Sequence, residues 1–404
     1  MLLDAKAVRR EKLNKTADVV VIGGGLIGSS AAYYLAKKGV KVIVIEKKGG
    51  LCFGASGANQ GGCPFQIFTS PVLELVNESL ELYKDLSEEL GYDLEFQNSG
   101  SLICSVDEEQ CSAVERHYQI FREKGLNVRL IEGGKIQELE PSLGKDVVIG
   151  VEEQYSGIVN PFKVTYGFAR AARKMGTEFI LSTEVKNIET NKGKITSVAT
   201  DRGKIETDFA VNAAGAWSPD IGKMLGLTIP VRPQRGQIIV TEPVPLNKRW
   251  RYILDADYLT TAFNAEKVAK SKDPRIKLGV AGSYIQANSG NWTVGSSRDF
   301  AGYNNKITVQ TLSYIAKRII KFMPQFADVN FIRAFAGFRP FCYVDGLPIL
   351  SKVDNLSGFI IATGHAGEGV TLAPITGKLI SELIIENRTS IPIDAFAFSR
   401  FKDQ

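Results

Sequence analysis

Residues 18–28 read Asp-Val-Val-Val-Ile-Gly-Gly-Gly-Leu-Ile-Gly, a short apolar run that breaks into a G-x-G-x-x-G turn. Glu46 follows eighteen residues after Gly28. The apolar run is typical of a buried strand, and the residues after the turn predict a helix over 26–38 and a second strand over 40–45. Strand, turn, helix, strand and acid in this order are the pattern of a βαβ unit that binds a dinucleotide.

Each glycine of this turn has a physical reason. Gly23 permits the tight turn, Gly25 lets the backbone approach a pyrophosphate, and Gly28 lets the helix pack closely on the strand. The helix points its partly positive N-terminus and free N–H groups at the phosphates, and Glu46 is placed to accept a hydrogen bond from a ribose hydroxyl. Alternatively the glycines only form a turn, but the complete register favours a cofactor-binding enzyme.

The length and composition indicate a globular protein with more than one core. The chain has 404 residues, 44% hydrophobic and 23% charged, which predicts two domains. The formal charge of +5 is spread out, and the basic tracts 9–15 and 267–277 lack interleaved aromatic residues, so we expect no nucleic-acid partner. Residues 1–16 lack the apolar core of a secretory signal. The sequence also has no run of about eighteen apolar residues, the length that a helix needs to cross a bilayer.

The cysteines and histidines argue against a disulfide framework and a metal centre. The five cysteines are Cys52, Cys63, Cys104, Cys111 and Cys342, an odd and widely spread set without a C-x-x-C pair. The two histidines, His117 and His365, are too few for a histidine-based metal site. We therefore expect no metal and a cytoplasmic protein.

The rest of the chain alternates helix and strand patterns. The glycine-rich run 54–62 offers free N–H groups to an anion or a flat ring, or is a flexible loop. The later part of the long stretch 242–277 is lysine-rich and poorly patterned. We expect His117 on the surface. Helices are predicted over 73–90, 108–124, 162–174, 309–323 and 370–386, and strands over 101–105, 128–131, 178–181, 185–190, 194–200, 204–211, 236–241, 276–282, 292–295 and 359–362.

Several of these motifs together resemble one family. The chain resembles the D-amino-acid oxidase (DAO) superfamily of FAD-dependent oxidoreductases over about residues 17–390. Within it, segments 233–237, 296–302 and 364–374 are similar to β subunits of heteromeric enzymes: the proline, hydroxyproline and opine dehydrogenases, sarcosine oxidase and hydrogen cyanide synthase. The motifs that carry the family resemblance are 23–28 with Glu46, 55–57, 212–217, 337–340, 345–348 and 364–369.

The resemblance implies an α/β fold. It consists of a Rossmann-type FAD-binding domain and a discontinuous α+β substrate domain whose mixed sheet lies over the flavin. The implied FAD-binding segments are 17–78, 145–220 and 333–404, and the implied substrate segments are 79–144 and 221–332.

The resemblance also implies a noncovalently held FAD. The helix over 370–386 should turn its N-terminus toward the pyrimidine edge of the flavin, and Val185 matches the position whose backbone meets the adenine. The implied cofactor-binding residues are Gly23, Gly25, Leu26, Ile27, Gly28, Glu46, Lys47, Ala55, Ser56, Asn59, Gln60, Gly61, Gly62, Val185, Ala213, Gly215, Trp217, Arg339, Gly364, His365, Gly367, Glu368, Gly369, Val370 and Thr371.

Three side chains are implied at the substrate. Arg339 would hold the substrate carboxylate, because a planar guanidinium matches a carboxylate with two hydrogen bonds; the alternative is a salt bridge to Asp345 or another acid. Tyr258 would place a hydroxyl over the site, or only pack there. His365 would bond to flavin or substrate, or only shape its loop.

The resemblance also has gaps. Some sarcosine oxidases tether a second flavin, FMN, through a histidine in the segment equivalent to 160–162, and this chain has none there. Covalent attachment of FMN by that route is therefore excluded, and noncovalent FMN at a subunit interface remains an alternative. Cys342 lies near the region where other relatives attach FAD, but a buried thiol is the preferred interpretation. Residues 262–290 exceed the connection in shorter relatives and suggest a lid, a partner-docking segment or a mobile loop.

The function that the resemblance implies is oxidation of the C–N bond of a small amino acid, preferably a secondary one such as proline, hydroxyproline or sarcosine. Hydride would pass to the flavin, and electrons would leave through partner subunits. Alternatives are a glycine or D-amino-acid oxidase that uses oxygen, an opine dehydrogenase subunit, a 2-hydroxy-acid dehydrogenase, and a non-catalytic subunit that only holds flavin.

Overall fold

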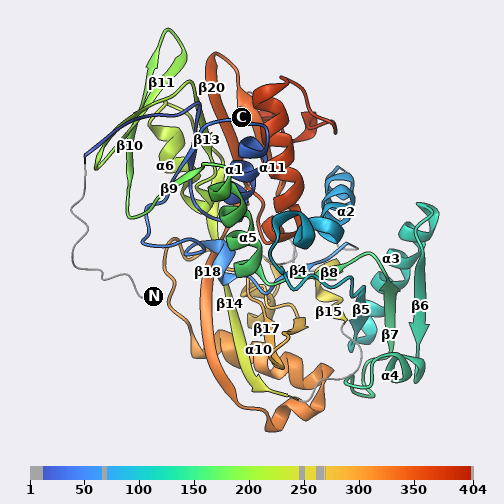
Figure 1. The fold of residues 1–404 in the computed structure, drawn as a ribbon. Coiled ribbons are helices and arrows are strands. Elements are labelled where there is room, and N and C mark those ends of the chain that lie inside the picture. The colour runs from blue at the N-terminus through green and yellow to red at the C-terminus, as the bar shows by residue number, and fades with distance from the viewer. Residues whose placement is uncertain (1–11, 66–70, 245–250, 261–267, 269, 402–404) are drawn as a thin grey trace.

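The computed structural model describes residues 12–65, 71–244, 251–260, 268 and 270–401. Two large mixed sheets dominate it, one in the upper and one in the lower half of Figure 1. The expected α/β class is therefore confirmed. In the described part of the chain, no helix has the length and apolar character needed to cross a membrane.

The upper sheet has ten strands and contains the βαβ unit. Its central strands, β20-β13-β2-β3-β9, all run parallel, and Val19 pairs with Val42 in register. The strands are β1 (Leu13–Thr16), β2 (Val19–Ile22), β3 (Val42–Ile45), β9 (Glu178–Ile180), β10 (Val185–Asn191), β11 (Lys194–Thr200), β12 (Gly203–Glu206), β13 (Phe209–Asn212), β19 (Ile349–Val353) and β20 (Leu356–Thr363).

The central strands are apolar on both faces because both faces are covered. Val19 and Val21 face a core made with the helices, whereas Val20 and Ile22 face a second core with residues of β10–β12. Figure 1 shows α1 beside α5 and α11. Gly377 of α11 lies so close to Ser30 of α1 that a Cβ there would overlap it. The helices are α1 (Leu26–Lys37), α2 (Val72–Leu90), α5 (Pro161–Lys174), α6 (Ser218–Lys223) and α11 (Gly369–Ile385).

The lower sheet has eight strands in the order β18-β14-β17-β16-β15-β5-β7-β6. Its longest members, β14 and β18, pair antiparallel from Val231↔Cys342 to Thr241↔Phe331. The strands are β5 (Ser101–Ser105), β6 (Val128–Glu132), β7 (Ile149–Glu153), β14 (Val231–Pro243), β15 (Tyr252–Asp255), β16 (Ser283–Gln286), β17 (Asn291–Gly295) and β18 (Phe331–Cys342). A small sheet joins β4 (Gly62–Cys63) and β8 (Gly157–Ile158).

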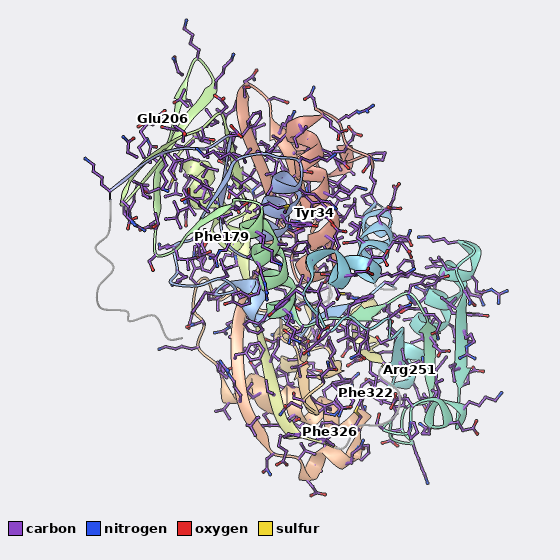
Figure 2. The ribbon with its side chains drawn as sticks, viewed as in Figure 1. Tyr34, Phe179, Glu206, Arg251, Phe322 and Phe326 are labelled. Carbon is purple, nitrogen blue, oxygen red and sulfur yellow. The ribbon has the colours of Figure 1, made fainter. Side chains whose placement is uncertain are left out.

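Short helices complete this half. Phe322 and Phe326, labelled in Figure 2, pack on Tyr284 and Trp292 and fix α10 to the sheet. The α-helices are α3 (Cys111–Glu123), α4 (Lys135–Leu139), α7 (Asp257–Thr260), α9 (Pro274–Lys277) and α10 (Val309–Phe322). In the described residues of both halves, the 3-10 turns are η1 (Ala55–Ala58), η2 (Glu108–Gln110), η3 (Gly215–Trp217), η4 (Pro324–Asp328), η5 (Asp394–Phe396) and η6 (Phe398–Phe401).

Some local predictions were wrong. The strand expected over 276–282 is replaced by α9, because Asp273 caps a turn that Pro274 begins, and β16 starts only at Ser283. The strand expected over 204–211 is two strands, β12 and β13. Strand β18 was not anticipated at all.

His117 was also predicted wrongly, because it is buried rather than on the surface. It is 9% exposed and lies on the same face of α3 as Val114 and Phe121, with its ring 4.4 Å from that of Phe121. Burial lowers the pKa of His117 to about 4. The residue is therefore a neutral part of the core.

The sheets also bear on the expected domain segments. Strands β7 and most of β18 belong to the eight-stranded sheet, although they fall in the segments 145–220 and 333–404 that we assigned to FAD binding. Backbone pairing therefore joins these strands to the eight-stranded sheet, while the division of the chain into FAD-binding and substrate segments stays a prediction. Of the extra segment 262–290, residues 262–267 and 269 lie outside the described residues, and the remainder forms α9 and β16.

Candidate active site

A long cavity of about 290 Å³ opens where β2, β3 and β13 end. The carboxyl ends of parallel strands are the usual ligand site of such sheets. Its wall also includes the start of α1, the turn η1 and the loop before α11. We call it the cofactor cavity. The predicted cofactor residues in its lining are Gly23, Gly25, Leu26, Ile27, Glu46, Lys47, Ala55, Ser56, Asn59, Val185, Ala213, Gly215, Trp217, His365, Gly367, Gly369 and Val370.

The N-terminus of α1 has the features that a pyrophosphate needs. Gly25 precedes the helix with no side-chain cap of its own, and Leu26 N donates to Ser56 Oγ at 2.9 Å. Gly23 has a φ of 111°, which favours glycine. A Cβ on Gly28 would overlap the carbonyl oxygen of Gly23. The conformation of Gly23 and the tight packing at Gly28 agree with the turn and helix packing expected of them, whereas the approach of Gly25 to a pyrophosphate stays a prediction.

Glu46 is held at the end of β3. Its Oε2 accepts a hydrogen bond from Gly24 N at 2.8 Å, and its Oε1 accepts one from Lys48 N at 2.8 Å. The carboxylate thus braces the glycine turn while it lines the cavity. Each oxygen retains a second lone pair, which suits a ribose hydroxyl. These residues fit an adenine dinucleotide such as FAD.

Other parts of the cavity had a weaker signal in the sequence. Thr183 and Glu184 precede Val185 in the chain and could have been found as its neighbours. Asp220, Ile221 and Met224 come from the region of α6, which carries no motif. The lining residues that we did not predict are Ile22, Ile45, Lys48, Phe53, Gly54, Thr183, Glu184, Ala214, Ala216, Asp220, Ile221, Met224, Pro340, Ala362, Thr363 and Ala366.

A second, smaller pocket of about 60 Å³ adjoins the cofactor cavity. Ala55, Asn59, Ala366 and Gly367 line both and form the partition between them. We call it the inner pocket. Its other lining residues are Ala58, Gln60, Gly62, Pro64, Gly236, Ile238, Tyr252, Tyr258, Ser296, Arg298, Gly337, Phe338, Arg339 and Glu368. Of the predicted cofactor residues, Gly28, Gly61, Gly364 and Thr371 are described but lie outside both linings.

Arg339 reaches the inner pocket from β18. Its Nη1 donates to the carbonyl oxygen of Ser297 at 2.9 Å, and its Nη2 donates to Ser296 Oγ at 2.8 Å. The guanidinium lies flat on Gly236, where a Cβ would be 2.6 Å from Cζ. Burial, helped by the charge of Arg298, lowers the pKa of Arg339 to about 10, so it remains a cation at neutral pH.

The alternative salt bridge between Arg339 and Asp345 is not formed. Asp345 instead accepts from Arg400 Nε at 2.7 Å and from the Cys342 thiol at 3.2 Å. Cys342 is a buried thiol, as preferred, and all five cysteines are free. The Arg339 guanidinium therefore faces the inner pocket without that acid.

Tyr258 lies in the wall of the same pocket, 8% exposed. The Arg298 guanidinium stacks 4.6 Å from the centre of its ring. The preceding residue, Asp257, accepts from Gln110 Nε2 at 2.6 Å and pairs with Arg275, which fixes α7. Arg298 was missed as a pocket residue although it lies in the motif 296–302.

His365 lines the cofactor cavity but is bonded inward. Its Nε2 lies 3.1 Å from Thr376 Oγ1 of α11, and it is 3% exposed. Burial lowers the pKa of His365 to about 3, so the ring is neutral. The bond ties the loop before α11 to that helix. A contact of His365 with flavin or substrate stays a prediction.

A wide cleft of about 890 Å³ lies on the other side of η1. It shares Phe53 and Trp217 with the cofactor cavity, and segment 160–162 lies in its wall. Phe53 and Ile332 are 67% and 61% exposed there. Among the described residues, no group of three or more histidine, cysteine or acidic side chains could hold a metal ion.

Comparison with known proteins agrees with this geometry. The model of the family described as FAD dependent oxidoreductase, DAO, matches residues 18–383. Glycine oxidase of Geobacillus kaustophilus is 28% identical, with 95% of this chain and 97% of that protein covered. Sarcosine oxidase subunit beta of Rhodobacter capsulatus is 24% identical, with 98% and 92% covered. The crystal structure of L-proline dehydrogenase from P. horikoshii superposes with a TM-score of 0.84 at 27% identity, covering 97% and 99%.

Proposed function

The chain belongs to the DAO family of FAD-dependent oxidoreductases, and on that premise we propose that it oxidises the C–N bond of a small amino acid. The observation that carries the proposal is the half-buried Arg339 guanidinium, held by Ser296 and Ser297 in a small pocket that adjoins the cofactor cavity. When bound, FAD accepts the hydride from the carbon beside the nitrogen.

Each part of the protein has a separate task in this proposal. The start of α1 and Glu46 hold the pyrophosphate and the ribose of the adenosine part. The cofactor cavity and the inner pocket adjoin at Asn59 and the loop before α11, so a flavin held in the cavity would contact a substrate held in the pocket there. Arg339 binds the substrate carboxylate, because its position is already fixed by two hydrogen bonds to Ser296 and Ser297.

The size of the inner pocket supports a small substrate. By this measure of volume, one water needs about 10–15 Å³, so 60 Å³ holds on the order of five water-sized groups. That number matches glycine or sarcosine directly, whereas the larger rings of proline and hydroxyproline would have to extend beyond the inner pocket or widen it. We prefer a secondary amine because segments 233–237, 296–302 and 364–374 resemble β subunits of heteromeric enzymes. That group includes enzymes for proline, hydroxyproline and sarcosine.

The wide cleft supports a partner subunit. Exposed Phe53 and Ile332 lie on it, and the similar sarcosine oxidase chain is named as a subunit. We therefore propose that electrons leave through a partner that covers this cleft, with noncovalent FMN as a further possible component at the interface. An oxidase that works alone with oxygen is the second candidate, favoured by the likeness to glycine oxidase.

A steady-state screen tests substrate and acceptor together. Purified protein is assayed with glycine, sarcosine, proline, hydroxyproline, opines, D-amino acids and 2-hydroxy acids, once with an artificial dye and once with an oxygen electrode. We expect turnover with at least one secondary amino acid and faster dye reduction than oxygen uptake. Turnover with 2-hydroxy acids alone would contradict the proposal, and fast peroxide release would favour the oxidase.

A further inference from the structure

Glu368 places a carboxyl group in the inner pocket. The binding of a substrate carboxylate by Arg339 does not use this group. Glu368 immediately precedes α11, and its backbone oxygen accepts from Leu372 N at 3.0 Å. Its side chain lines the inner pocket next to the partition residues Ala366 and Gly367. Within the ranges that the structure describes, no hydrogen bond or ion pair to the Glu368 carboxyl is formed.

The ionisable groups that interact with the Glu368 charge come from four other places in the fold. Arg339 of β18 and Arg298, which follows β17, act on its charge, and Tyr252 of β15 and Cys63 of β4 also feel it. Arg339 is anchored by Ser296 and Ser297, and Arg298 stacks on Tyr258. The two cations are therefore fixed, and Glu368 is the acidic residue that lines the inner pocket together with them.

Amine oxidation sets a requirement that this acid can satisfy. An amino acid arrives as a zwitterion, but hydride can leave the carbon only when the nitrogen has a lone pair to form the C=N bond. One proton must therefore leave the ammonium group first. A carboxylate beside the nitrogen attracts the ammonium and offers a place for this proton.

We propose that Glu368 is a catalytic residue that pairs with the substrate ammonium and accepts its proton, an inference that rests on the proposed amino-acid oxidation. The N–H bond of the ammonium breaks and an O–H bond forms on Glu368, which gives a neutral amine and a carboxylic acid. This step changes no oxidation state, and the proton later passes to solvent. Arg339 and Glu368 then recognise the two ends of one zwitterion.

The pKa of Glu368 suits this task. Burial raises it to about 7, although Arg298 and Arg339 oppose the shift. A base is most effective when its pKa lies near the working pH. Above about pH 7 the group is mostly a carboxylate that can accept a proton, and below that value it is mostly protonated and cannot.

The first test is anaerobic stopped-flow reduction of the flavin over a range of pH. We expect the wild-type rate to rise with pH and level off above the pKa of Glu368. In Glu368→Gln the rate at pH 7 should fall by about 10²–10⁴-fold. It should recover at alkaline pH, where the substrate amine is already neutral.

The second test measures binding without turnover. Methoxyacetate and tetrahydrofuran-2-carboxylate are ether analogues of sarcosine and proline that carry no ammonium. At pH 9 their negative charge should be repelled by the Glu368 carboxylate, so we expect them to bind about tenfold more tightly to Glu368→Gln than to wild type. Binding is followed by the shift of the flavin absorbance spectrum.

The control is Glu382→Gln, which removes another largely buried carboxyl from α11 while Ser390 loses its partner. It should leave both measurements unchanged. If Glu368→Gln reduces its flavin at the wild-type rate and with the wild-type pH profile, the proposal is overturned. It is also overturned if the variant has normal FAD content but its reduction rate stays low at alkaline pH. If no amino acid reduces wild-type flavin, the proposed function itself fails, which is a separate result.

Discussion

The cofactor cavity and the inner pocket are built by different means, although they share a wall. The cofactor cavity is lined at strand ends and helix starts by many glycine, alanine, serine and threonine residues, together with larger apolar and charged side chains. The inner pocket instead presents the side chains of Arg339, Arg298, Glu368 and Tyr258. Cofactor binding should therefore be sensitive to added volume, and substrate binding to changes of charge and hydrogen bonding.

The largest effect expected in this comparison is a pure steric change in the glycine turn behind the wall of the cofactor cavity. In Gly28→Ala the new Cβ would overlap the Gly23 carbonyl oxygen, so α1 must move away from β2. Because such overpacking costs about 1–3 kcal/mol, we expect FAD affinity to fall up to about 100-fold. The measurement is a titration of apoprotein with FAD by flavin fluorescence.

The matched control is Gly134→Ala. Gly134 has a φ of −60° and no neighbouring atom within 4 Å of an added Cβ. This change should leave FAD affinity unaltered. Tight FAD binding by Gly28→Ala would contradict the role of this turn.

The next largest effect should separate substrate binding from FAD binding. Arg339→Lys keeps the charge but loses the planar pair of donors, and hydrogen bonds to charged groups contribute about 1.5–3 kcal/mol. We expect KM for the amino acid to rise about 30-fold while FAD content stays normal. Arg400→Lys, which changes the arginine beside Asp345, should leave KM unchanged. Equal loss of FAD and substrate binding would exclude the carboxylate role of Arg339.

The cofactor cavity was easier to predict from the sequence than the inner pocket, because its main motif is local whereas the pocket is formed by distant segments. The βαβ unit is local: Gly23, Gly25 and Gly28 lie within six residues, and each has a steric task that the sequence states directly. Strand β18 has Arg333, Arg339 and Pro340 in a half-exposed run, so only its long pairing with β14 makes it a strand. Tyr252 and Arg298 line the same pocket as Arg339 because β14–β18 are neighbours in one sheet. No local sequence pattern could indicate this arrangement.

A steric change can also be directed at the inner pocket. In Gly236→Ala the added Cβ would be 2.6 Å from Cζ of Arg339, so the guanidinium must leave its place. We expect KM to rise about tenfold, equivalent to about 1.4 kcal/mol. Since Gly236 acts as a positioning residue through Arg339, the same change in an Arg339→Lys background should add little. Additive effects in this double-variant comparison would contradict that connection.

The smallest expected effect concerns Tyr258. Tyr258→Phe keeps the ring against Arg298 and removes only the hydroxyl, and one net hydrogen bond contributes about 0.5–1.5 kcal/mol. We expect KM to rise about threefold if the hydroxyl meets the substrate. Tyr343→Phe, at a 47% exposed tyrosine, is the control. Identical kinetics of Tyr258→Phe and wild type would assign Tyr258 to packing.

The most direct measurement mixes the isolated chain, loaded with FAD, with single amino acids in the absence of oxygen and follows flavin absorbance. If both sites belong to this chain, sarcosine, proline or a similar small amino acid will bleach the oxidised flavin without any partner. If dithionite bleaches the flavin but every amino acid leaves it oxidised, the inner pocket is not a substrate site and the account is contradicted.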